Sequence, residues 1–295
     1  MKKLIILLLI VLDRQIVFAQ TYNYNSLDNK TIVSIVYKES SFLNTDPKTV
    51  VDENTNTTLV TNYPPGSNRF IVTSNLDFKT KDSPLVKFKV MRIQQKTSKF
   101  SIDTNVPFGS DEISKMAIEG YLPLIKKNIN VKLNQKNNLT KDQIEIIELS
   151  QMDLPILNSQ SVLSGILINK PDNTNSWTDS VKVKDGFYIN TYTMVDEAKH
   201  QYKLNGYYKP NPKKESSLKK STTDVTDLQP GQGIEAEVEL LEMKYEASIL
   251  LSGQYTGLIQ SIDLNTYSST NIKSIGIIEN EQLKTKTRIS NKISE

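Results

Sequence analysis

Histidine, cysteine and serine are the side chains that most often form a catalytic centre, and this chain offers few of them in a usable arrangement. Its single histidine, His200, stands between Lys199 and Gln201 at the start of an expected strand. A surface or edge position is the favoured interpretation for such a residue. The absence of cysteine excludes thiolate nucleophiles and thiolate metal sites. No serine lies in a Gly-x-Ser-x-Gly turn, so we expect no nucleophilic serine of that type.

The Ser-x-x-Lys spacing occurs twice, as Ser216 with Lys219 and as Ser217 with Lys220. In serine acyl-transferases this spacing places a hydroxyl and an amine on one turn of a helix inside a cleft. Here both copies lie in a polar segment, and the companion Ser-Asp-Asn and Lys-Thr-Gly motifs are absent. We therefore interpret both copies as coincidences of composition and expect no catalytic residues.

Carboxylates are the remaining groups that could support hydrolysis or metal binding. Glu235, Glu237 and Glu239 alternate with apolar residues, so they would project from one strand face about 7 Å apart. Such a row could bind calcium weakly, but a catalytic pair needs two groups facing each other across a cleft. Residues 172–175 resemble a calcium loop only in composition, because they lack the EF-hand glycine and glutamate. We favour a solvated strand face and predict no metal site, with a carboxylate- or metal-dependent hydrolase as the alternative function.

No motif for a phosphate-bearing cofactor or for nucleic acid is present. Gly231-Gln232-Gly233 lacks the third glycine and the following helix of a dinucleotide fingerprint. Aromatic residues interleaved with arginine would favour base stacking, but the chain has few arginines. We therefore expect no cofactor and no nucleic-acid partner.

Period-two alternation is the main pattern after residue 30, and it is typical of strands with one buried face. In Leu85–Ile93, for example, Val86 and Phe88 share one face while Lys87 takes the other. The expected strands are Thr31–Tyr37, Arg69–Phe78, Leu85–Ile93, Ser161–Ile168, Phe187–Val195, Tyr202–Tyr208, Ile234–Leu241, Met243–Ser252, Leu258–Leu264 and Ile272–Ile278. The C-terminal stretch Leu283–Glu295 is polar and lysine-rich, and we recognise no sorting domain there.

Two segments in the middle of the chain have helical spacing instead. Apolar residues of Asp111–Lys127 recur on one helical face, although Gly120 and Pro123 predict a kink or an early end. A weaker helix is expected from Thr140, and Pro155 would end it. The segment 209–233 is rich in proline, glycine and lysine, which predicts a long mobile loop.

The N-terminus has the order of features typical of a secretory signal peptide. Lys2 and Lys3 precede the apolar run Leu4–Leu12, and Val17-Phe18-Ala19 forms a small-residue cleavage site. The apolar run is shorter than the roughly 20 residues that a transmembrane helix needs. Since the chain has no cysteine, neither a lipoprotein anchor nor disulfide bonds are expected.

Removal of this leader would leave a nearly neutral protein. The whole chain has 36 basic and 33 acidic residues, and the first 19 contain three basic residues and one acidic residue. The remaining 33 basic and 32 acidic residues almost cancel. The net charge therefore gives no support for a polyanionic partner.

A resemblance is carried by short motifs in the second half of the chain. Lys170-Pro171, Ser176-Trp177-Thr178-Asp179, Tyr192–Val195 and Gly253-Gln254-Tyr255-Thr256-Gly257 resemble an uncharacterised family of secreted β-rich proteins from Bacteroidota. The chain departs from the family pattern before Trp177, where Asn175 replaces an aspartate and no glycine is present. The resemblance implies a strongly curved antiparallel sheet, similar in architecture to lipoprotein-carrier half-barrels. It implies no assigned activity.

These observations together predict a mainly β (α+β) fold: a curved antiparallel sheet or half-barrel with one or two helices from the middle of the chain packed on it. We expect a signal peptide at residues 1–19 and a β-rich domain at 20–295, either single or in two similar halves (20–155 and 156–295). Trp177 is expected to anchor the core rather than to line a pocket.

The expected function is that of an exported, non-catalytic envelope protein, periplasmic or extracellular, without a transmembrane segment. Its partner would be a hydrophobic ligand such as an acyl chain, or another envelope protein. Two alternatives stay open, the hydrolase named above and a structural module of a surface assembly.

Overall fold

The computed structural model shows that the chain is mostly antiparallel sheet. It describes residues 25–43, 48–52, 57–61, 68–81, 84–98, 100–106, 112–125, 127–133, 163, 165–168, 171, 174–183, 186–210, 219–223, 234–274 and 277–294. The first half contains η1 (Asn25–Leu27), β1 (Thr31–Phe42), β2 (Lys48–Asp52), β3 (Thr57–Thr61), β4 (Asn68–Lys79), β5 (Leu85–Lys96), β6 (Ser101–Asp103), α2 (Glu112–Tyr121), η2 (Leu122–Leu124) and β7 (Asn128–Lys132). The second half contains β8 (Ser176–Val183), β9 (Gly186–Asp196), β10 (Gln201–Pro210), β11 (Lys219–Thr223), β12 (Ile234–Leu251), β13 (Ile259–Ser274) and β14 (Ile277–Ser294).

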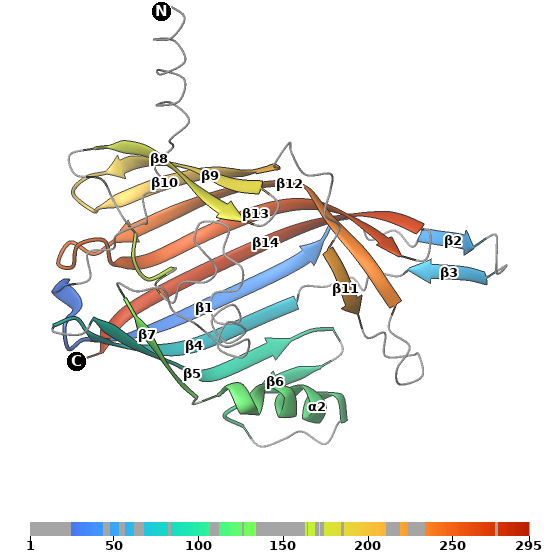
Figure 1. The fold of residues 1–295 in the computed structure, drawn as a ribbon, viewed down its shortest axis with the longest axis horizontal. Coiled ribbons are helices and arrows are strands. Elements are labelled where there is room, and N and C mark those ends of the chain that lie inside the picture. Colours follow the sequence, from blue (N-terminus) through green and yellow to red (C-terminus); the bar gives the residue numbers. More distant parts are fainter. Residues whose placement is uncertain are drawn as a thin grey trace, which may run out of the picture.

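One large open sheet contains all but two of these strands (Figure 1). Its order is β6-β5-β4-β1-β14-β13-β12-β10-β9-β8, with β7 added beside β5 and β11 added beside β12. The strands β2 and β3 pair only with each other. The strand β1 joins the two ends of the chain, because it pairs with β4 on one side and with β14 on the other.

Alternating side chains give the sheet one buried face. On β1 and β4, residues such as Ile32, Val72 and Leu76 are almost completely buried, and on β12 Ala247 and Ile249 continue the same layer. Residues 166–168 also belong to this core. The Ile168 amide donates to the Gly257 carbonyl between β12 and β13, and the Ile259 amide at the start of β13 donates to the Ile166 carbonyl. The expected pattern of one apolar and one polar face is therefore present across the sheet.

The buried face also contains polar residues on its central strands. Asn291 of β14 is buried, and its Nδ2 donates hydrogen bonds to the carbonyl oxygens of Gly165 (2.7 Å) and Ile259 (2.8 Å). Thr285 and Thr287 of β14 are also buried. The polar C-terminal segment forms a strand because β1 and β13 pair with it on both sides and satisfy its backbone hydrogen-bonding groups.

The helix α2 lies beside β6 at one end of the sheet (Figure 1). Ile118 is buried, and the Tyr121 ring packs edge-on against Phe70 with ring centres 5.9 Å apart. Met116, which belongs to the apolar pattern, is 71% exposed. The helix ends at Tyr121 and a 3-10 turn containing Pro123 follows, so the early end predicted from the sequence is confirmed.

Several strand boundaries differ from those predicted. The segments 234–241 and 243–252 form one strand, β12, with a register shift between Leu240 and Glu242. Among the described residues of 161–168, only a single bridge from Leu167 to Leu258 has strand pairing. Within the segment predicted as a loop, Lys219–Thr223 forms β11, which pairs with β12.

Some predictions fall on parts of the chain that the structure does not describe. The leader at residues 1–19 and the helix expected from Thr140 lie outside the described residues. The division into two halves stays a prediction. None of the helices in the described ranges has the length and apolar character needed to cross a membrane.

Candidate functional site

The single histidine lies at a turn. His200 follows β9, adopts a positive φ of 51°, and its backbone amide donates to the Glu197 carbonyl at 3.1 Å. Its ring faces Gly253, where an added Cβ would come within 3.1 Å of Nε2. Within the described part of the chain, no group of three or more acidic or histidine side chains could hold a metal ion.

The three glutamates singled out in the sequence lie on β12. Glu235 and Glu237 are placed opposite Thr222 and Lys220 of β11 in the register, and Glu239 lies opposite Asn271 of β13. Their side chains are outside the described part, so the hydrolase alternative stays a prediction. Of the two Ser-x-x-Lys copies, both lysines lie on β11, whereas both serines are outside the described residues.

Trp177 is half-buried and packs against the core, as predicted. Its ring stacks on that of Tyr192, with centroids 4.5 Å apart and an interplanar angle of 8°. The ring of Tyr202 meets it edge-on at 5.6 Å. In residues 172–175, which resemble a calcium loop in composition, the Thr174 hydroxyl donates a hydrogen bond to the Pro171 carbonyl. Asp172 and Asn173 lie outside the described residues.

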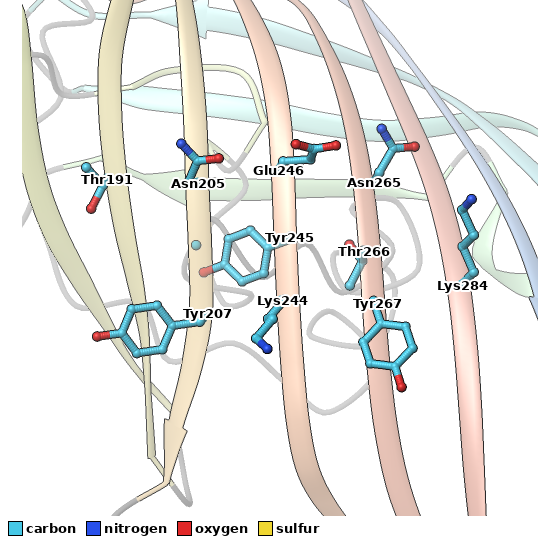
Figure 2. A pocket seen from close by; sticks show the side chains of 11 residues that line it. Thr191, Asn205, Tyr207, Lys244, Tyr245, Glu246, Asn265, Thr266, Tyr267 and Lys284 are labelled. Atoms are coloured by element: carbon cyan, nitrogen blue, oxygen red, sulfur yellow. The ribbon is translucent and has the colours of Figure 1, made fainter.

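A solvent-open groove lies on the exposed face of the sheet, across β9, β10, β12, β13 and β14 (Figure 2). Its volume is about 720 Å³. We call it the tyrosine groove. Its lining comprises Thr191, Asn205, Gly206, Tyr207, Lys244, Tyr245, Glu246, Asn265, Thr266, Tyr267 and Lys284.

The first row of the tyrosine groove alternates aromatic and basic residues. Tyr207 is paired with Lys244, Lys244 with Tyr267, and Tyr267 with Lys284 in the strand register. All four side chains point to the exposed face, because on each strand the buried residues, such as Leu204, Tyr245, Thr266 and Thr285, occupy the opposite phase of the alternation. Tyr207 is 48% exposed. Neighbouring strands lie about 4.8 Å apart, so the two tyrosines stand about 10 Å from each other.

The second row is polar and runs parallel to the first (Figure 2). Asn205, Glu246 and Asn265 are paired in register across β10, β12 and β13. Each lies two residues along its strand from a member of the first row, a separation of about 7 Å. All three side chains are exposed. The groove therefore has one aromatic and basic wall and one wall of amides and a carboxylate.

The floor between the rows is set by a glycine and a tyrosine. Gly206 is paired with Tyr245, whose side chain belongs to the buried face. A Cβ at Gly206 would come within 2.0 Å of Tyr245 Cε2, so the ring occupies the space that any other side chain would need. The Tyr245 hydroxyl donates to Asn190 Oδ1 at 2.7 Å, and burial raises the pKa of this tyrosine. These contacts fix the ring beneath the groove.

The charges in the tyrosine groove are almost balanced. Lys244 Nζ lies 2.5 Å from Glu242 Oε1, and this contact raises the pKa of the lysine. Glu246 lies 4.0 Å from Lys203 Nζ. Among the described residues, Lys284 has no ion pair. The groove can therefore offer aromatic faces, amide donors and acceptors, and little net charge.

Sequence reasoning missed this site, although a signal for it exists. In the alternation of β10, Tyr202 and Leu204 lie on the buried face, which places Tyr207 on the exposed face. In β13, Leu264 and Thr266 are buried, which places Tyr267 outside. Large aromatic residues in the outward phase of two nearby strands are therefore the signal. Their alignment depends on strand pairing over more than 50 residues, which periodicity alone does not give.

Comparisons with known proteins give no family for this chain. No protein-family model and no curated protein matches it. One solved structure with a similar chain is of lipid–protein interactions in lipovitellin, with 9% sequence identity and a TM-score of 0.48. The alignment covers 90% of this chain and 25% of the lipovitellin chain. The resemblance to the Bacteroidota family stays a prediction.

Proposed function

We propose that this chain is a non-catalytic binding protein and that the tyrosine groove is its ligand-binding site. The observation that supports the proposal is the alignment of Tyr207 and Tyr267 on the exposed face, on either side of Lys244. Exposed rings at the surface of a depression are typical of binding sites rather than of unused surface. The leader predicts that binding takes place outside the cytoplasm.

The rings would supply most of the binding free energy. Covering one tyrosine face removes apolar surface from water and contributes about 1–2 kcal/mol at the usual area coefficient. The ligand expected from the sequence, an acyl chain or another envelope protein, would use the same rings. The polar row would then determine which ligands are accepted, because its groups lose water when the groove is covered.

Native mass spectrometry of the protein isolated from the cells that produce it tests this proposal. We expect a bound mass that stays unchanged on incubation, because the proposal includes no reaction. The bound mass should be absent from a variant carrying both Tyr207→Ala and Tyr267→Ala. The control variant is Ile35→Ala, since Ile35 is 41% exposed on the same face of β1, away from the groove. It should retain the ligand.

Three results would overturn the proposal. A ligand that remains bound to the double tyrosine variant would place the binding site elsewhere. Conversion of the bound mass into a product would identify an enzyme. A protein that is isolated empty and remains empty after exposure to the cell extract would also contradict it.

A further inference from the structure

We infer that the occupant of the tyrosine groove is a neutral oligosaccharide chain that lies across the strands, parallel to the two rows. The inference rests on the proposed function and names the class of its ligand. It is carried by three properties of the groove: the spacing of the rings, the position of the amides, and the balance of charge.

The ring spacing suits a chain of repeated sugar units. Tyr207 and Tyr267 are two strands apart, so the backbone positions that carry their rings lie about 10 Å from each other along the groove. Sugar rings present apolar C–H faces that pack on aromatic rings, and an extended chain repeats such faces at regular intervals. Two tyrosines in one row can therefore contact two units of the same chain.

The polar row suits the hydroxyl groups at the edges of those units. A hydroxyl both donates and accepts hydrogen bonds, and the asparagine amide does the same. Within the described residues, the exposed side chains of Asn205 and Asn265 make no hydrogen bond, which leaves both available. Glu246 adds two acceptor oxygens between them. A chain stacked on the tyrosines would place its hydroxyls about 7 Å across the groove, toward this row.

The charges oppose a polyanionic ligand. Proteins that bind nucleic acid or acidic polymers gather several unpaired cations along the path of the polymer. Here Lys244 is paired with Glu242, and Glu246 on the opposite wall is paired with Lys203. Only Lys284 adds a cation without an ion pair among the described residues. A neutral chain fits this balance better than an acidic one.

An acyl chain fits the aromatic row but not the polar row. An acyl chain that covered the groove would remove water from the amides of Asn205 and Asn265 and from the carboxylate of Glu246 without supplying hydrogen bonds. Polar groups that lose water without gaining hydrogen bonds weaken binding, and a charged group weakens it most. This cost would offset the gain from covering two rings. A sugar chain satisfies both rows at once.

Isothermal titration calorimetry with a panel of neutral hexasaccharides tests the inference. The panel contains α- and β-linked glucose, mannose, galactose and xylose chains, together with galacturonate hexamer and palmitate as comparison ligands. We expect at least one neutral chain to bind at millimolar concentration or below. Tyr207→Ala and Tyr267→Ala should each weaken that binding by about tenfold or more, as loss of an aromatic stacking partner does. Asn265→Ala should weaken it less.

The controls separate loss of the site from loss of the fold. Ile35→Ala should bind like the unchanged protein, and circular dichroism should be the same for all variants. Binding of palmitate or galacturonate alone, with dependence on Tyr207, would overturn the inference but support the proposed function. If no ligand of the panel bound but a protein partner bound in a way that depends on Tyr207, the oligosaccharide inference would be overturned and the proposed function supported. Binding of a neutral chain that does not depend on either tyrosine would overturn both.

Discussion

At the scale of single residues, Gly206 has the most specific environment in the candidate site. The Tyr245 ring from the neighbouring strand lies across it, and the Tyr245 hydroxyl is held by Asn190. A tyrosine that covers a glycine in the adjacent strand restores the packing that the missing side chain would provide. The pair also brings the floor of the tyrosine groove close to the backbone. Replacement of either residue should therefore affect the stability of this part of the sheet.

We expect Gly206→Ala to lower the free energy of unfolding by about 1–3 kcal/mol, because the new methyl group would overlap the fixed Tyr245 ring. Gly120→Ala is the matched control, since no atom lies within 4 Å of a Cβ added there in α2. That change should raise stability by about 0.5–1 kcal/mol through helix propensity. Urea denaturation measures both, and equal effects of the two substitutions would contradict the packing argument.

Asp179 should make stability depend on pH. Burial raises the pKa of its carboxyl above the ordinary value, although hydrogen bonds with Asn190 and Tyr192 oppose the shift. The folded state therefore holds the proton more tightly than the unfolded chain. Stability from the neutral carboxyl is present below the unfolded pKa of 3.8 and is lost as pH rises through the folded pKa. Asp179→Asn should lose less stability than the unchanged protein when pH is raised from about 4 to 7.

Asp196 provides a control of opposite sign. Lys199 lowers the pKa of its carboxyl, so its contribution is present above the unfolded pKa and is lost as pH falls. Asp196→Asn should therefore lose less stability than the unchanged protein when the pH is lowered toward about 3. Thermal unfolding measured between about pH 3 and 7 separates the two. Parallel pH profiles of stability for Asp179→Asn and the unchanged protein would contradict the raised pKa of Asp179.

At the scale of elements, β14 shows why part of the fold could not be predicted. Alternation identified β1, β4, β5, β9 and β10 well, because each has apolar residues on its buried face. Between residues 285 and 291, β14 instead buries three polar residues, Thr285, Thr287 and Asn291, beside a single apolar one, Ile289. Its place between β1 and β13 follows from pairing with strands that are distant in sequence, and a polar strand gives no local sign of that pairing.

The loop prediction failed in part for a similar reason. Lysine, serine and threonine in Lys219–Thr223 indicate a solvated segment, and the segment is nevertheless strand β11. The strand β11 pairs with the end of β12 that β10 does not reach. The open edge of β12, and not the composition of Lys219–Thr223, therefore determines that this segment is a strand. By contrast, Pro123 acts locally, and its effect on α2 could be predicted from the sequence.

We expect Asn291→Ala to lower the free energy of unfolding by about 2–4 kcal/mol. The Asn291 side chain donates to the Gly165 and Ile259 carbonyls, and its loss would leave two buried acceptors without these donors. Lys292→Ala is the control, because Lys292 is exposed on the same strand and should change stability by about 0.5 kcal/mol or less. Guanidinium denaturation provides the comparison, and equal values for the two variants would show that Asn291 does not fix residues 165 and 259.

At the scale of the whole molecule, the open sheet separates two tasks between its faces. The buried face forms a continuous core that joins both halves of the chain. The exposed face of β9 to β14 carries the tyrosine groove. The composition could not predict this division, because the groove residues come from five strands and become neighbours only through register. That the chain is not an enzyme stays a prediction from its sequence, and a binding role is our proposal.

Binding of a ligand to the exposed face of the sheet, at the tyrosine groove, can be tested by hydroxyl-radical footprinting of the isolated protein before and after removal of its bound ligand. We expect the ligand to protect Tyr207 and Tyr267 from oxidation, while Tyr37, which lies on β1 away from the groove, is oxidised equally in both samples. Protection of residues elsewhere, with Tyr207 and Tyr267 oxidised equally in both samples, would contradict it.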